Sequence, residues 1–195
     1  MKVRKNFTLV EFIVVIVIIA VLASIVAPNA FKTIEKAKIV KAKQDAKTLR
    51  SAVGNYFSDM GFYPPDVYRG DDPGFMKRDY WNPDNEPGYP ILCYPEDFPT
   101  TQQAERLACC WKGPYLERWP YFTPWGGKYD YNYWPEGGSR YGVNLPPGVY
   151  IGIQRNYDDE DKTGIPPKSE QVMVDDGTDA DGAVNGEVQL LLFRL

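Results

Sequence analysis

The chain of 195 residues is 44% hydrophobic and 14% aromatic, and its formal net charge is −4. It contains no histidine, no nucleophile-elbow motif and no phosphate-binding loop, so the sequence predicts a protein that is not an enzyme. The charge is uneven: residues 1–6 carry +3, Glu11 carries −1, residues 32–50 carry +5, and residues 51–195 therefore sum to −11. Such an acidic segment argues against nucleic acid as a partner.

An almost unbroken apolar run extends from Phe7 to Ala27, directly after the basic residues Lys2, Arg4 and Lys5. At a rise of about 1.5 Å per residue, a helix over this run is roughly 31 Å long, which matches the hydrocarbon core of a bilayer. The run therefore predicts a membrane-spanning helix.

Glu11 is the acidic residue within this run. An ionised carboxylate in lipid costs several kcal/mol unless it finds a partner, and the pattern offers none within the same helix. Either Glu11 stays hydrated or takes up a proton near the membrane interface, or it pairs with a positive group on another chain.

The basic residues, the segment Phe7-Thr8-Leu9-Val10-Glu11, the apolar run and Pro28 together resemble the class III signal of type IV pilins and type II secretion pseudopilins. The resemblance implies that a prepilin peptidase cleaves between Asn6 and Phe7 and that Phe7 is N-methylated, although the family usually has Gly where this chain has Asn6. It also implies a helical filament of many copies, in which Glu11 of one subunit offsets the N-terminal amine of its neighbour.

Residues 29–60 change to an amphipathic pattern, which predicts that the helix continues into water. Pro28 predicts a bend or a local unwinding, and Gly54 and Gly61 are expected to end the helix. The lysines and the arginine of residues 32–50 form a basic stripe. This stripe is interpreted as a solvated face, as a site for acidic lipids, or as a surface that pairs with acidic heads of neighbouring subunits.

The chain from Tyr63 to about Pro124 is rich in Pro, Gly and aromatic residues, which predicts a packed, loop-rich region. Residues 111–116 (WKGPYL) and 123–131 (TPWGGKYDY) resemble the major pseudopilin of type II secretion, as does Gly61-Phe62-Tyr63-Pro64 after the helix. The same aromatic residues could instead stack on sugars, so a membrane-anchored carbohydrate-binding module is an alternative.

Short runs that alternate or are rich in β-branched and aromatic residues predict strands in the last third of the chain. Tyr129, Tyr131 and Tyr133 are expected on one face of a strand. Further strands are predicted at Tyr141–Leu145, Val149–Gln154, Gln171–Val174 and Val188–Arg194. The fold class is α+β, with a long N-terminal helix packed on a small antiparallel sheet and a loop-rich, aromatic-dense insertion, which is the pilin fold that the resemblance implies.

The three cysteines predict a disulfide between Cys93 and either Cys109 or Cys110, because adjacent cysteines rarely pair; three reduced thiols are the alternative. The absence of histidine argues against zinc.

The acidic segment with Asp175, Asp176, Asp179 and Asp181 is a candidate calcium site, as the resemblance to major pseudopilins also implies. The alternative is a solvated turn without metal.

The sequence thus predicts a leader at residues 1–6, a membrane and filament-core helix at 7–28, its amphipathic continuation at 29–60 and an extracytoplasmic head at 61–195. The resemblance implies a single-pass inner-membrane protein that joins a periplasmic or extracellular filament, most similar to a type II secretion pseudopilus. A type IV pilus subunit for adhesion, motility or DNA uptake is the alternative. The implied partners are further copies, minor pilins or pseudopilins, prepilin peptidase, and an assembly platform with a cytoplasmic ATPase.

Overall fold

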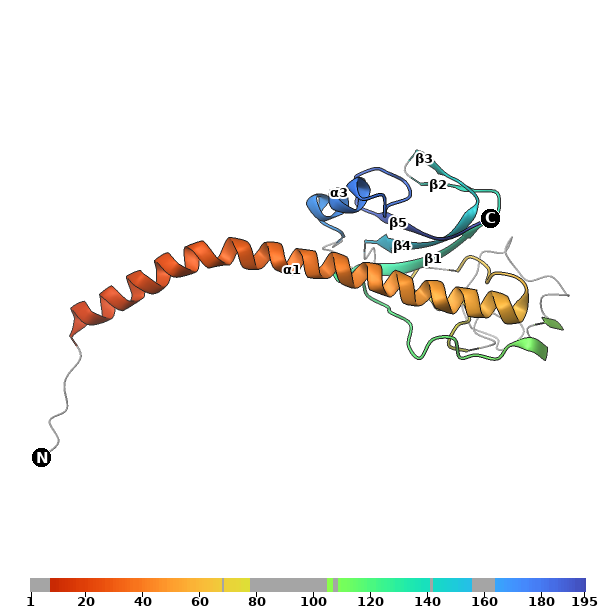
Figure 1. The fold of residues 1–195 in the computed structure, drawn as a ribbon, viewed down its shortest axis with the longest axis horizontal. Coiled ribbons are helices and arrows are strands. Elements are labelled where there is room, and N and C mark those ends of the chain that lie inside the picture. Colours follow the sequence, from red (N-terminus) through yellow and green to blue (C-terminus); the bar gives the residue numbers. More distant parts are fainter. Residues whose placement is uncertain (1–7, 68, 78–104, 107–108, 141, 156–163) are drawn as a thin grey trace, which may run out of the picture. The chain divides into compact units, whose positions relative to one another are not determined.

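The structure is a computed structural model that describes residues 8–67, 69–77, 105–106, 109–140, 142–155 and 164–195. The predicted α+β class is confirmed, with one long helix and a small antiparallel sheet (Figure 1). The chain forms two compact units, Met1–Lys38 and Ile39–Leu195. The elements in chain order are α1 (Leu9–Met60), β1 (Lys128–Trp134), β2 (Gly138–Arg140), β3 (Val143–Leu145), β4 (Gly148–Gln154), α3 (Pro167–Asp175) and β5 (Val188–Arg194).

The long helix α1 runs from Leu9 to Met60 without interruption. Pro28 lies inside it, so the local unwinding considered at this position is wrong. The helix ends as predicted at Gly61, whose φ of 75° lies in the left-handed region that favours glycine. The Gly61 N–H closes the last turn with a 2.7 Å hydrogen bond to the Phe57 carbonyl. Gly54, by contrast, lies within the helix.

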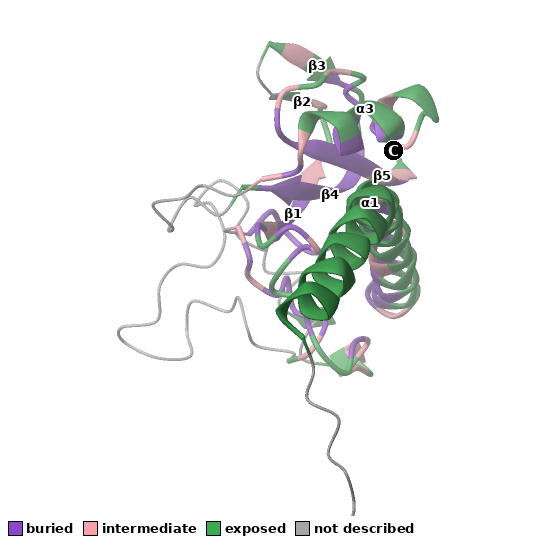
Figure 2. Ribbon diagram, turned by 90° about the vertical axis from the view of Figure 1, so that its left-hand side faces the viewer, coloured by how far each residue is buried: buried purple, intermediate pink, exposed green. Residues whose placement is uncertain are grey.

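The second half of α1 buries one face in the head. Its buried residues recur three to four positions apart, as expected for an amphipathic helix with one face on a core. They are Ile39, Ala42, Ala46, Leu49, Ala52, Val53, Tyr56 and Met60. Figure 2 shows this buried face against the sheet.

The sheet that receives this helix has the order β1-β4-β5, and both of its strand pairs are antiparallel. The central strand β4 is buried along its whole length, and Tyr131 on β1 lies opposite Ile151 on β4. Tyr129 and Tyr131 are fully buried, and Tyr133 packs partly buried against the same core, so their predicted common face is confirmed. The short strands β2 and β3 form a separate hairpin.

The predicted strand at Gln171–Val174 is wrong, because these residues belong to helix α3. Pro167 stands at the start of this helix, where its missing N–H costs nothing. Ser169, Glu170 and Met173 are buried, whereas Val172 is 47% exposed. The burial therefore follows the period of a helix and not the alternation of a strand.

An aromatic cluster joins the loops to the core. The Tyr56 ring meets Phe75 and Tyr115 edge-on, with centroid distances of 5.9 and 5.5 Å. Phe75 also contacts Tyr131 and the buried Trp119. The described part of the predicted loop-rich region is thus packed, as expected.

Candidate functional site

The start of α1 forms a capping box. The Thr8 N–H and hydroxyl both donate to Glu11 Oε2, at 2.8 and 2.7 Å, and the Glu11 N–H donates to Thr8 Oγ1 at 3.3 Å. These bonds satisfy backbone donors that a helix start leaves open. The expectation that Glu11 has no partner within its own helix is therefore wrong. Sequence reasoning missed the spacing of Thr8 and Glu11, which is the ordinary signature of such a box.

The apolar part of α1 presents hydrophobic side chains on all its sides. From Leu9 to Val26 the exposed fraction of the large hydrophobic side chains lies between 45% and 75%. The segment is long and apolar enough to cross a membrane. A helix that is apolar all round needs lipid or other helices around it, because exposure of its apolar side chains to water is unfavourable on every side. This surface is the principal candidate for membrane insertion and assembly.

The predicted processing site, Asn6 and Phe7, lies outside the described residues and stays a prediction. Pro28 is part of the exposed half of α1, and its role in assembly also stays a prediction.

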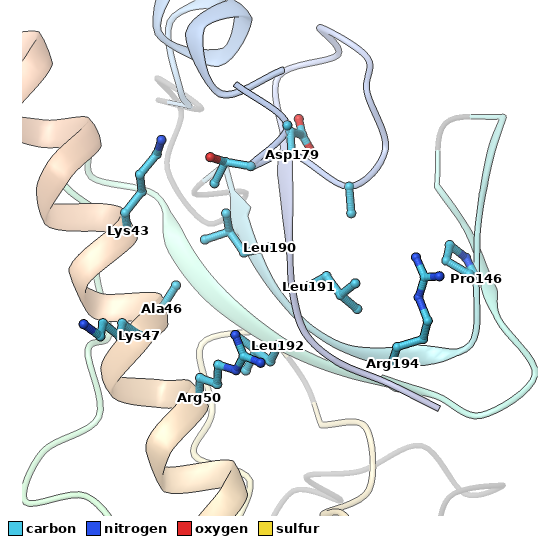
Figure 3. Close-up of a pocket in the computed structure, with 13 residues that line it drawn as sticks. Lys43, Ala46, Lys47, Arg50, Pro146, Asp179, Leu190, Leu191, Leu192 and Arg194 are labelled. Atoms are coloured by element: carbon cyan, nitrogen blue, oxygen red, sulfur yellow. The ribbon is translucent and has the colours of Figure 1, made fainter. Parts of the chain in front are cut away.

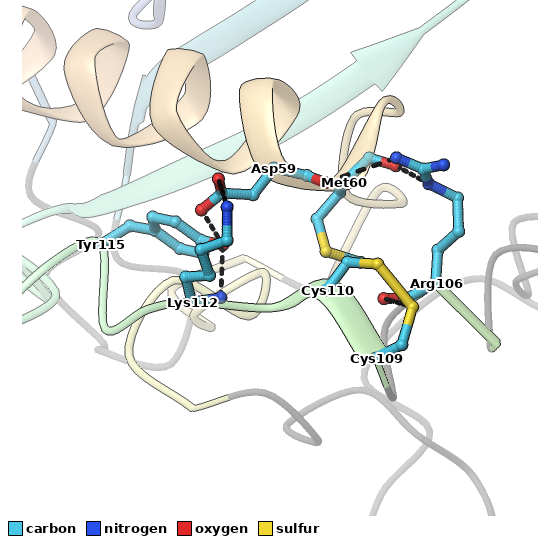
Figure 4. Close-up of a disulfide and its surroundings, with 7 residues drawn as sticks. All are labelled: Asp59, Met60, Arg106, Cys109, Cys110, Lys112 and Tyr115. Carbon is cyan, nitrogen blue, oxygen red and sulfur yellow. Dashed lines mark hydrogen bonds and ion pairs between the residues drawn. A yellow bond between two sulfur atoms is a disulfide. The ribbon is translucent and has the colours of Figure 1, made fainter.

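At the other end of α1, Asp59 ties the helix to a loop (Figure 4). Lys112 Nζ lies 3.1 Å from Asp59 Oδ1, and the Tyr115 hydroxyl donates to Oδ2 at 3.0 Å. The Lys112 hydrogen bond is the main cause that lowers the pKa of Asp59. Arg106 donates to the Met60 carbonyl beside it. The Trp-Lys-Gly-Pro-Tyr-Leu segment is thus anchored to the helix end, which sequence reasoning did not reveal.

A disulfide joins Cys109 to Cys110 beside this contact, with 3.8 Å between their Cα atoms (Figure 4). The predicted bridge from Cys93 to one of these cysteines is therefore corrected, because each of the two sulfurs already has its partner. Cys93 itself lies outside the described residues.

The described tryptophans are used mainly for packing. Trp119 is fully buried and Trp125 is 8% exposed. Trp111 donates from Nε1 to the Gly74 carbonyl at 3.1 Å, and Trp134 donates to Asp66 at 3.1 Å. These contacts favour a structural use of the aromatic residues over sugar stacking.

The four predicted calcium ligands have separate partners. Asp176 pairs with Lys43 on α1, and Asp175 accepts a 2.7 Å hydrogen bond from Gln171. Asp181 accepts bonds from the Ala183 N–H and from Asn185. In the described part of the chain no group of three or more acidic or cysteine side chains is placed to hold a metal ion. Calcium binding by this segment stays a prediction.

Asp179 is the buried member of this segment, at 4% exposure. Its Oδ1 accepts N–H bonds from Gln189 and Asp181, whereas its Oδ2 has no hydrogen-bond partner among the described residues. Burial raises the pKa of Asp179 to about 7, and the nearby carboxylate of Asp181 acts in the same direction.

Glu170 on α3 is a fully buried carboxylate that sequence reasoning missed. It accepts N–H bonds from Asn185 at 2.7 Å and from Gly186 at 2.8 Å, and so holds the loop before β5 against α3. Burial raises its pKa. No pattern in the sequence around Glu170 predicts that its carboxylate would hold the loop before β5.

Comparison with known families gives two matches. Residues 33–136, just over half of the chain, match the family described as PilW, C-terminal. Residues 1–27 match the prokaryotic N-terminal methylation motif. No solved structure matches the chain.

Among individual proteins, the chain is similar to the type II secretion system core protein G of several bacteria. It is 48% identical over 61 residues to the proteins of Pectobacterium carotovorum and Escherichia coli, which covers 31% of this chain and 39% and 42% of theirs. It is 37% identical over 65 residues to the fimbrial protein EcpC of Eikenella corrodens, covering 33% and 42%. The similarity thus spans less than half the length of these relatives.

Proposed function

Since the chain belongs to the family described as PilW, C-terminal, and begins with the prokaryotic N-terminal methylation motif, we propose that it is a structural subunit of a type IV pilin-like filament. The observation that supports this most is the apolar surface of α1, which is exposed on all sides from Leu9 to Val26. Lipid covers this surface before assembly, and the equivalent helices of other copies cover it in the filament.

The proposed path begins with processing. Prepilin peptidase cleaves between Asn6 and Phe7, and Phe7 is N-methylated. The subunit then waits in the inner membrane, with residues 7–28 as its anchor and residues 61–195 outside the cytoplasm. An assembly platform with a cytoplasmic ATPase moves it into a filament together with minor pseudopilins. Glu11 moves in this step from lipid to the neighbouring N-terminal amine.

We favour the major pseudopilin of type II secretion, a filament that drives protein export. The relatives named type II secretion system core protein G support this choice, as do the aromatic segments that resemble the same branch. In the structure these segments are structural: Trp125 and Leu116 are each 8% exposed, and Tyr115 packs against the core. They help to form the globular head, which each subunit of such a filament contains.

A type IV pilus subunit is the second candidate. The similarity to the fimbrial protein EcpC favours it, since that protein is 37% identical over the aligned segment. The two candidates share the processing, the membrane anchor and the filament, and they differ in what the filament moves or displays.

The experiment that tests the filament proposal is intact mass and N-terminal sequencing of the protein recovered from its native cells. We expect a chain that starts at N-methylated Phe7, and a chain that retains Met1 in cells without prepilin peptidase. Retention of Met1 in cells with an active peptidase would contradict the proposal. Deletion of the gene separates the two candidates. Loss of secreted proteins would support the type II secretion pseudopilin, and loss of surface pili would support the type IV pilus subunit.

A further inference from the structure

A groove of about 430 Å³ lies beside the second half of α1, within the unit Ile39–Leu195. Helix α1 forms one side of the groove, and the segment 116–122, which precedes β1, forms the other. Leu49, Leu116 and Trp119 line it with buried side chains. The base of the groove is therefore apolar.

Exposed side chains form the rim of this groove. Tyr121 is 45% exposed and Phe122 is 65% exposed, although both are large and aromatic. Arg118 is exposed in the same segment. In the described part of the chain Arg118 has no ion-pair partner, whereas Lys41 on α1 pairs with Asp45. The rim therefore offers two aromatic rings and one positive charge that is not held in an ion pair.

Helix α3 presents an exposed stripe that suits this rim. The stripe follows the positions i, i+3, i+4 and i+7, which lie on one face of a helix. Its residues are Lys168, Gln171, Val172 and Asp175. Val172 is 47% exposed, and Asp175 accepts a hydrogen bond from Gln171 but has no ion-pair partner among the described residues. The stripe thus places a negative charge next to an exposed apolar side chain.

The groove and α3 lie on opposite sides of α1. Lys41 and Asp45 line the groove, whereas Lys43 pairs with Asp176 at the end of α3. At about 100° per residue, positions 41 and 43 point in nearly opposite directions from the helix axis. Figure 3 shows the side of α1 away from the groove, where Lys43 extends towards the loop that carries Asp179. The α3 helix of one chain therefore does not reach the groove of the same chain.

We propose that the groove receives the exposed stripe of α3 from a second copy of this chain. Val172 enters beside the ring of Phe122, and Asp175 pairs with Arg118 of the receiving copy. This inference rests on the proposed filament and names one contact between its heads. The contact is heterologous, because one surface of a subunit meets a different surface of its neighbour, and such contacts build open helical filaments.

Charge complementarity favours this occupant. Arg118 and Asp175 are exposed and opposite in sign, and each surface also carries an exposed charge of the other sign. Glu117 precedes Arg118, and Lys168 lies about two turns before Asp175 on α3. One orientation of α3 on the groove is therefore attractive and the reverse is repulsive. The matched surface is small, so it fits a contact that acts together with the proposed packing of α1, and not a dimer by itself.

The test uses the full chain in its native cells and measures the amount of filament. The groove variant carries Arg118→Glu, the stripe variant carries Asp175→Arg, and the double variant carries both substitutions in one chain. The control variants Arg194→Glu and Glu136→Arg make the same changes of charge at exposed positions outside both surfaces. Membrane level and N-terminal processing are measured in parallel.

We expect the groove variant and the stripe variant each to form about tenfold less filament, because like charges then meet at the contact. The double variant restores the filament, since the reversed charges at positions 118 and 175 of neighbouring copies attract again. Both control variants keep the wild-type amount. Phe122→Ala also lowers the amount of filament but leaves the melting temperature of the chain unchanged, because this side chain is mostly exposed.

Two results would overturn the inference. Wild-type filament levels from the groove variant or from the stripe variant would show that the two surfaces do not meet. Loss of filament in both single variants without restoration in the double variant would show that the groove receives a partner other than α3 of a second copy. Absence of filaments and of processing from the wild-type chain would instead contradict the proposed function.

Discussion

Tyr115 donates a hydrogen bond of 3.0 Å to Asp59, which connects the middle of the loop-rich region to the last turn of α1. Lys112 holds the other oxygen of the same carboxylate at 3.1 Å. The Tyr115 ring packs against Tyr56, so Tyr115→Phe keeps the packing and removes only the hydroxyl. We expect a loss of about 1 kcal/mol in the free energy of unfolding, measured by denaturant titration of the solubilised chain. Tyr121→Phe, at a 45% exposed position, is the control and should change nothing.

The contact that Asp59 makes with Lys112 and Tyr115 should weaken in acid. The pKa of Asp59 is lowered in the folded protein, chiefly by the hydrogen bond from Lys112. A lowered pKa stabilises the fold above the unfolded value, and this contribution is lost as the pH falls through the folded value. In Asp59→Asn, the free energy of unfolding should therefore fall less steeply as the pH is lowered. At neutral pH it should be lower than in the wild type by a constant amount. The same dependence of stability on acidic pH in the variant and in the wild type would contradict the role of this contact.

The capping box separates two roles of Glu11. Thr8→Ala removes the cap from the helix start and should cost about 1 kcal/mol of local helix stability, while filament formation remains. Glu11→Ala removes the carboxylate that is proposed to meet the neighbouring amine, and should abolish filaments with membrane insertion intact. Filament yield and membrane fractionation measure both effects. Equal loss of filaments in the two variants would mean that Glu11 acts through the cap alone.

Asp179 predicts a stability that falls with rising pH. Burial raises the pKa of Asp179 to about 7, above its unfolded value, so its contribution is fully present at low pH and is lost as the pH rises through the folded value. Between pH 5 and pH 7 the expected loss is about 2 kcal/mol. Thermal melting in a chelator should show this slope, and Asp179→Asn should remove most of it. Added calcium should change neither curve if the segment is a solvated turn, and a large rise of the melting temperature with calcium would support the predicted calcium site.

The aromatic cluster makes the head sensitive to cavities. Phe75 is fully buried against Tyr56, Trp119 and Tyr131. Phe75→Ala should lower the free energy of unfolding by about 3–5 kcal/mol, because it removes packed surface and leaves a void. Phe122→Ala, at a 65% exposed position, should cost less than about 0.5 kcal/mol. Similar melting temperatures for the two variants would contradict the role of Phe75 in the core.

The residues of α1 and of the sheet show how much the sequence by itself determined. The apolar run, the spacing of Ala42, Ala46 and Leu49, and the stop at Gly61 predict the helix, because each is a property of neighbouring residues. The strand at Tyr129 follows in the same way from local alternation, and the strands at Val149 and Val188 follow from short runs of β-branched, aliphatic and aromatic residues. The methylation motif is likewise a contiguous stretch of residues, so the resemblance to pilins and pseudopilins could be inferred from the sequence alone.

Only the tertiary structure decided the contacts between distant residues. It placed Gln171–Val174 in a helix, because burial of Glu170 and Met173 outweighed the short β-like run. It held Asp59 with Lys112 and Tyr115, and it paired Lys43 on α1 with Asp176 after α3. Such pairs depend on how two elements pack, and packing depends on the whole core, whereas periodicity reports only which face of one element is apolar.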